Sequence, residues 1–167
     1  MGTTPQGNSS FANIDFEIIN RSANPVVVNG TTYAVGDAVM TITTDENGHA
    51  STGNDALPYG TYEVRESATN ESMLLTWTGE IVQVRQNGHS VAITAVNDVE
   101  RGGLSVEKQD TITGSTPQGD ANFQGITFEI INNSRNPVMV EGQKYQPGEV
   151  VKTLVTDSEG KPAAADD

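Results

Sequence analysis

Three stretches of the sequence each end an apolar strand face on a side chain that could take part in amide chemistry. Strand side chains alternate between two faces, so Tyr62, Val64 and Glu66 share the face that the aromatic and aliphatic residues mark as buried. Asn97 ends the apolar face of 91–97 in the same way, and Lys108 ends that of 104–108. A carboxyl, a carboxamide and an amine are the groups needed to form an amide bond between two side chains.

A plainer reading exists for each of these residues. Lys108 could form an ordinary ion pair with Glu66, and Asn97 could cap a strand or turn. The inward phase of all three is compatible with the bond, because burial favours a neutral amine beside a neutral carboxyl, and it is the family resemblance described below that decides for the bond. The Lys108 amine would attack the Asn97 carboxamide carbon, Glu66 would polarise the oxygen and relay protons, and ammonia would leave. Such a bond forms once per domain, so the chain is not expected to be an enzyme.

At these residues the chain resembles the Cna B-type (SpaA-like, prealbumin-like) repeat domains of Gram-positive surface proteins and pilins. In that family a Lys on the first strand joins an Asn or Asp on the last strand, helped by the Glu of a motif like Tyr62–Glu66. The resemblance implies that Lys108 and Asn97 are isopeptide residues and that Glu66 is the proton relay. It also implies an all-β fold, an antiparallel β-sandwich of the prealbumin-like, Ig-like kind.

Short strands and tight turns fill the rest of the chain. Residues 11–19 alternate, and 26–28 and 31–33 flank Asn29-Gly30, whose central residues suit a hairpin turn with positive φ. Residues 38–44 are rich in Thr and β-branched side chains, and 73–78 and 80–85 flank Gly79. No helical stripe of useful length is present. These signals independently predict an antiparallel β-sandwich.

The sequence repeats itself at a constant offset of 112 residues. Thr4-Pro5-Gln6-Gly7 returns as 116–119, and Phe16–Asn20 returns as 128–132. We therefore predict one domain over 1–100 that lacks its first strand, and the N-terminal part of a second copy over 101–167. The equivalent of Lys108 falls before residue 1, and the second copy stops before the equivalent of Tyr62–Glu66.

Composition excludes several classes of function. With 22 acidic and 9 basic residues the net charge is −13, which disfavours nucleic acid and anionic membranes as partners. No stretch is apolar for long enough to insert into a membrane. Cysteine is absent, so neither disulfides nor thiolate metal sites are available, and a surface protein would need another covalent staple.

Other candidate sites have ordinary interpretations that we prefer. Asp45, Asn47 and Asp55 are oxygen ligands without the spacing of a calcium loop, and turn chemistry explains them better. We expect His49 and His89 to be exposed turn residues. Trp77 could stack on a sugar or a collagen-like ligand, but a strand aromatic beside apolar neighbours is more often core. No metal and no cofactor is expected.

The leading functional hypothesis is a stalk or spacer module of a bacterial cell-surface adhesin or pilin-like protein, in the extracellular cell-wall compartment. Its expected partners are neighbouring tandem domains of the same parent protein, while a host ligand would bind through other domains. The alternative is an adhesin domain that itself recognises a matrix protein or glycan. That alternative needs exposed aromatic residues, of which the sequence offers few.

Lys108 and Asn97 are not expected to be bonded to each other within one chain. The resemblance implies that first and last strands run parallel, and parallel neighbours need a crossover longer than the segment 98–107. Between chains the strand around Lys108 could fill the open edge of another copy, giving a swapped homo-oligomer. We also expect the second copy to be the less stable half.

Overall fold

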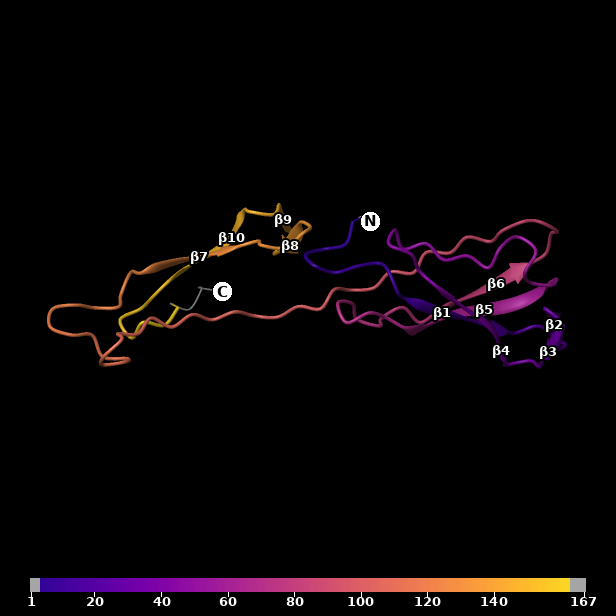
Figure 1. Ribbon diagram of the computed structural model, residues 1–167, viewed down its shortest axis with the longest axis horizontal. Coiled ribbons are helices and arrows are strands. Elements are labelled where there is room, and N and C mark those ends of the chain that lie inside the picture. Colours follow the sequence, from indigo (N-terminus) through magenta and orange to yellow (C-terminus); the bar gives the residue numbers. More distant parts are fainter. Residues whose placement is uncertain (1–3, 163–167) are drawn as a thin grey trace. The chain divides into compact units, whose positions relative to one another are not determined.

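The computed structural model describes residues 4–162, which contain ten β-strands and no helix (Figure 1). The chain forms two compact units. The first unit is Ser9–Glu100, and the second unit joins Arg101 onward with the N-terminal stretch that ends at Asn8. In the described part of the chain there is no helix of the length and hydropathy that a membrane span requires.

An antiparallel four-stranded sheet with the order β4-β1-β5-β6 forms the first layer of the first unit. Its strands are β1 (Asp15–Asn20), β4 (Ala38–Thr43), β5 (Gly60–Ala68) and β6 (Glu80–Val84). In the central pair, Ile18 lies opposite Val64 and Phe16 lies opposite Glu66. The register of β1 and β5 therefore places the carboxyl of Glu66 on the apolar face.

A short hairpin, β2 (Val26–Val28) and β3 (Thr31–Tyr33), forms part of the second layer. Its turn residues Asn29 and Gly30 have φ of 49° and 79°, so the predicted hairpin turn is confirmed. Val26 and Val28 are buried, while the intervening Val27 is 57% exposed.

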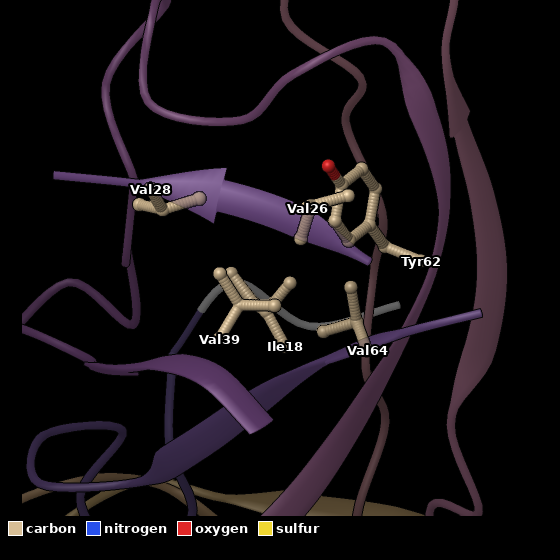
Figure 2. Packing of buried hydrophobic residues seen from close by; sticks show 6 residues of the cluster. All are labelled: Ile18, Val26, Val28, Val39, Tyr62 and Val64. Atoms are coloured by element: carbon tan, nitrogen blue, oxygen red, sulfur yellow. The ribbon is translucent and has the colours of Figure 1, made fainter. Parts of the chain in front are cut away.

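The core of the first unit lies between the sheet and this hairpin (Figure 2). It comprises Ile18, Val26, Val28, Val39, Tyr62 and Val64. The predicted alternation of β5 is confirmed, because Tyr62, Val64 and Glu66 are all buried. Tyr62 is fully buried and its hydroxyl donates to the Pro58 carbonyl at 2.9 Å. Burial raises the pKa of the Tyr62 phenol.

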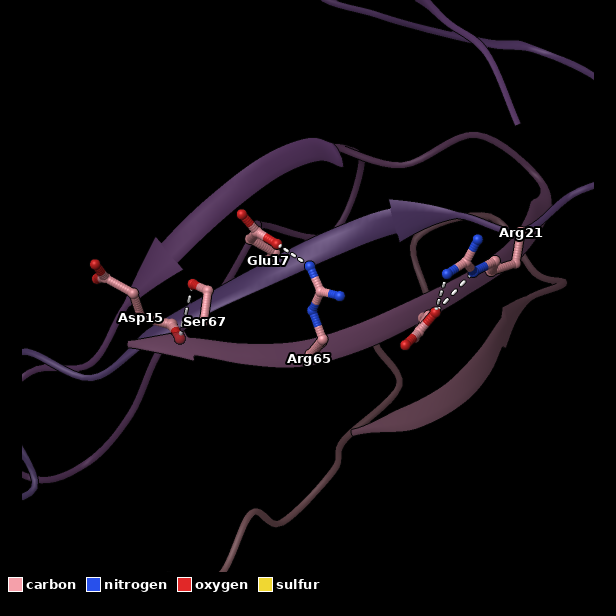
Figure 3. A network of polar contacts seen from close by, with 6 residues as sticks. Asp15, Glu17, Arg21, Arg65 and Ser67 are labelled. Carbon is pink, nitrogen blue, oxygen red and sulfur yellow. Dashed lines mark hydrogen bonds and ion pairs between the residues drawn. The ribbon is translucent and has the colours of Figure 1, made fainter. Parts of the chain in front are cut away.

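The opposite face of the sheet carries cross-strand ion pairs (Figure 3). Arg65 donates to Glu17 at 2.7 Å, and Arg21 lies 2.6 Å from Glu63. Pairs exposed to this extent each add little stability. They mark this face as the solvent side, as the alternation in 61–65 predicts.

Asn20 anchors the hairpin to the sheet. Its side chain is fully buried, and its Nδ2 donates to the carbonyls of Asn24, Tyr33 and Ala34 at 3.2, 3.3 and 3.2 Å. Its Oδ1 accepts from the backbone N–H of Ser22 at 2.9 Å. One side chain thus satisfies backbone groups on both sides of the hairpin, which fixes where β2 begins.

The second unit contains β7 (Thr127–Ile131), β8 (Val138–Val140), β9 (Gln143–Tyr145) and β10 (Val150–Val155). The pairing of β7 with β10 repeats that of β1 with β4 in the same register, and Asn132 repeats the contacts of Asn20 with the carbonyls of Asn136 and Tyr145. The two units differ in how far equivalent residues are buried: Ile19 is 4% exposed, whereas its equivalent Ile131 is 51% exposed. Within residues 4–162, β7 has a strand neighbour on one side only.

Three expected strands are not strands in the structure. Residues 73–78, 91–97 and 104–108 belong to no ladder, apart from a single bridge between Met73 and Val99. The backbone N–H of Lys108 does donate to the carbonyl of Gly160 at 2.7 Å. The prediction that these three stretches are strands is wrong. Residues 91–97 do alternate in burial, but a strand also needs a neighbour to pair with. In the part of the chain that the structure describes, 91–97 and 104–108 have none.

Candidate functional site

Glu66 and Asn97 meet on the apolar side of the sheet. The Asn97 Nδ2 donates to both carboxyl oxygens of Glu66, at 2.6 and 2.8 Å. Glu66 is 3% exposed and Asn97 is half-buried. The alternation of β5 positions the carboxyl, and the inward phase of 93–97 positions the carboxamide. Two residues that the sequence singled out therefore form one pair, in which the carboxyl is buried and the carboxamide half-buried.

The carboxamide is held at its oxygen as well. The backbone N–H of Trp77 donates to the Asn97 Oδ1 at 3.1 Å, and the Thr76 hydroxyl lies 3.5 Å from it. The Trp77 ring packs edge-on against Phe16 with centroids 5.7 Å apart, so the backbone at Trp77 is anchored by its own side chain. The sequence did not predict this contact, because every residue except proline has a backbone N–H and its position depends on the fold.

This arrangement suits nucleophilic attack on the Asn97 carboxamide. Negative charge would develop on the oxygen, where the Trp77 N–H already points. Glu66 contacts the nitrogen that would leave, which is where a proton must arrive. The expected polarising contact from Glu66 to the oxygen is not the one observed, and the Trp77 N–H occupies that position instead.

Gly79 allows the chain after Trp77 to turn into β6. Its φ is +104°, and a Cβ at this position would lie 2.7 Å from the carbonyl oxygen of Val64. Only glycine accepts both this conformation and this approach to β5. Gly79 thereby sets how close the Trp77 segment runs to the strand that carries Glu66.

Lys108 belongs to the second unit. Its ammonium donates to the backbone carbonyl of Gln109 at 2.6 Å and lies 5.7 Å from the centroid of the Phe123 ring. The structure thus brings Glu66 and Asn97 together in the first unit and gives Lys108 other contacts in the second.

The remaining candidates behave as turn and core residues. The Asp45 carboxylate accepts from the N–H groups of His49 and Asn47 at 2.9 and 2.8 Å, and these bonds lower its pKa. No group of acidic or His residues with metal-site geometry occurs among residues 4–162. His49 and His89 are both exposed, as expected. Trp77 packs against the core, as predicted.

The first unit is thus an all-antiparallel β domain with a sheet, a covering hairpin and a carboxyl–carboxamide pair on its apolar side. A model of the SpaA prealbumin-like fold domain matches residues 3–99, so the chain belongs to this family, as the sequence predicted. No curated protein matches the chain. Among solved structures, a streptococcal ancillary pilin aligns with 21% identity and a TM-score of 0.38, over 90% of this chain and 44% of that pilin. The chain therefore spans less than half of the pilin's length.

Proposed function

We propose that this chain is a structural module of a bacterial cell-surface protein, an adhesin or pilin-like subunit, in which tandem domains act as a stalk. Membership of the SpaA family supports the surface role. The observation that carries the proposal is the buried Glu66–Asn97 pair, whose carboxamide is fixed at both nitrogen and oxygen. A structural role in sheet packing alone would be met by apolar residues at lower desolvation cost.

The pair is an acceptor for a lysine amine. A neutral amine would form a bond from its Nζ to the Asn97 Cγ, and the bond from Cγ to Nδ2 would break. Glu66 would take the proton that the amine loses and pass it to the departing nitrogen, which leaves as ammonia. Atoms balance without any cofactor, and the protein is consumed as its own substrate, so it is not an enzyme.

The mechanical consequence gives the module its function. An amide bond between the first and last strands of a domain would carry tensile force through a covalent path. Without it, force on the chain ends would separate the strands in turn. A stalk without cysteines gains from this bond the stability that disulfides give other surface proteins.

The lysine that reacts with Asn97 should come from another molecule. We propose that Lys108 of one molecule serves the Glu66–Asn97 pair of another, in a strand-swapped homo-oligomer. Residues 91–97 alternate in burial but pair with no strand among the described residues, and an unpaired extended segment is a template for strand addition.

Intact mass under denaturing conditions tests the proposal. We expect an unmodified monomer, together with a denaturant-resistant dimer that is lighter by one ammonia per link. Glu66→Gln and Asn97→Ala should abolish the dimer, while Asn87→Ala, at an exposed turn, should not. A monomer lighter by one ammonia would contradict the exchange between chains, and absence of any link would contradict amide formation in this chain.

A ligand-binding role has one observation in its favour. Tyr59 is 71% exposed beside a groove lined also by 84–88, and the Arg85 guanidinium lies 4.7 Å from its ring centroid. An exposed aromatic next to a cation can contact a sugar or a peptide. Specific binding to collagen, fibrinogen or a glycan, lost in Tyr59→Ala, would favour this function over the stalk.

A further inference from the structure

A short segment before the first unit is bound on the surface of the second unit. The backbone N–H of Gly7 donates to the carbonyl of Pro137, and the carbonyl of Gly7 accepts from the N–H of Asn136, both at 3.1 Å. Residues up to Asn8 belong to the same compact unit as Arg101 onward, so this contact lies inside one unit.

Two side chains of the segment extend the contact. The Gln6 Oε1 accepts from the backbone N–H of Met139 at 3.0 Å, and the Asn8 Oδ1 accepts from that of Arg135 at 3.1 Å. The segment therefore contacts four backbone polar groups, those of Arg135, Asn136, Pro137 and Met139, before and within β8. Asn136, Pro137 and Met139 are half-buried as a result.

Glycine is required at the centre of the segment. Gly7 has a φ of +58°, and a Cβ there would lie 3.5 Å from both the Ser134 hydroxyl and a methyl of Val138. A side chain would be strained in this backbone conformation, while the Cβ itself would make only ordinary van der Waals contacts.

The first unit has the same surface, and there it is open. Shifted by 112 residues, the docking positions are 23–27. Asn24 and Pro25 are exposed, and Val27 is 57% exposed. Because Val28 and Thr31 flank the two-residue turn as a hydrogen-bonded pair, the N–H of Val27 points away from the hairpin.

The chain also contains a second copy of the bound segment. Residues 116–119 repeat Thr4-Pro5-Gln6-Gly7, and Gly119 has a φ of +56°, close to that of Gly7. Asp120 follows where Asn8 follows in the first copy, and its carboxylate is also an acceptor. Gly119 and Asp120 are exposed, and a Cβ at Gly119 would meet nothing within 4 Å.

We propose that the edge at Ala23–Val27 is a docking site for Pro117–Asp120 of a second copy of this chain. Gly119 would exchange two backbone hydrogen bonds with Asn24 and Pro25, as Gly7 does with Asn136 and Pro137. This contact joins two different patches, so it is heterologous and propagates into an open, head-to-tail array. Four hydrogen bonds make a weak contact, so we expect it to form in the millimolar range. The amide chemistry of Glu66 and Asn97 is not needed for it.

A titration of the isotopically labelled full chain with a synthetic peptide of residues 115–122 tests this. We expect saturable amide shifts at Ala23, Asn24 and Val27 in the millimolar range. The equivalent amides of 135–139 should not move, because the segment ending at Asn8 already occupies that surface. A peptide carrying Gly119→Val should bind at least tenfold more weakly.

A matched pair of chain variants makes the test specific. Val27→Pro removes the outward N–H on an edge strand that tolerates proline, and it should weaken peptide binding several-fold. Val27→Ala keeps the N–H and should bind like the natural chain. The proposal is overturned if the peptide produces no saturable shifts at 23–27 up to millimolar concentration, if the glycine-substituted peptide binds equally well, or if the two Val27 variants behave alike.

Discussion

Replacing Asn20 by alanine should destabilise the first unit more than any exposed change in the same loop. Asn20 is fully buried and makes four side-chain hydrogen bonds to backbone groups. Asn20→Ala would leave three carbonyls and the N–H of Ser22 without this partner.

The magnitude follows from the cost of orphaned polar groups. Each buried group without a partner costs about 1–3 kcal/mol, and water entering beside the half-exposed carbonyls recovers part of that sum. We expect a loss of about 3–4 kcal/mol, against a total stability of roughly 5–15 kcal/mol for a domain. The control is Asn24→Ala, at an exposed position whose backbone carbonyl is kept, which should cost less than about 0.5 kcal/mol.

Urea unfolding followed by tryptophan fluorescence is the assay. Trp77 is the only tryptophan of the chain and packs on Phe16, so its signal reports on the first unit. With a slope of about 1.3 kcal/mol per molar urea, the midpoint of Asn20→Ala should fall by roughly 2–3 M. A midpoint within about 0.5 M of that of Asn24→Ala would refute the assignment of Asn20 as the anchor of the hairpin.

Three further predictions concern the backbone, pH and the two units. Gly79→Ala should lower the urea midpoint by more than a surface Gly→Ala change such as Gly53→Ala, because its Cβ would press on the Val64 carbonyl; equal midpoints would contradict this. Hydrogen bonds from the N–H groups of Ile112 and Thr113 lower the pKa of Asp110 from 3.8 to about 2. The depressed pKa means that Asp110 stabilises its turn above pH 4 and loses this effect as the pH falls towards 2, and an NMR midpoint near 3.8 would contradict the turn geometry. Amide exchange should be slower in β5 than in β7, since β5 has strands on both sides and β7 on one; equal protection would be evidence against the unequal burial of the two units.

Local rules were enough to predict most of the first unit from its sequence. The Asn29-Gly30 turn specifies its hairpin, because few residue pairs accept two positive φ values. Alternation in β5 placed Glu66 inside before any contact was known. These features depend on a few adjacent residues, so they can be read from a short window of sequence.

Features that depend on distant partners were not predictable in this way. Residues 91–97 alternate like a strand but are not one, because pairing is a property of two segments. The Trp77 N–H at the carboxamide depends on how the chain crosses β5 at Gly79. The contact of Gly7 with Pro137 joins residues far apart in the sequence. The repeat alone does not indicate that the segment around Gly7 binds the surface before β8.

We propose that Glu66 and Asn97 form an acceptor for a lysine on an added strand. The most direct test mixes the Lys108→Arg chain, which cannot supply its own lysine, with a synthetic peptide of residues 102–110 that retains Lys108. Mass spectrometry after denaturation should show an adduct equal to the sum of the two masses less one ammonia, with the link mapped to Asn97. The adduct should be absent with Glu66→Gln and with a peptide carrying Lys108→Arg. An adduct that persists without the Glu66 carboxyl, or no adduct when the peptide is bound, would contradict this role of Glu66 and Asn97.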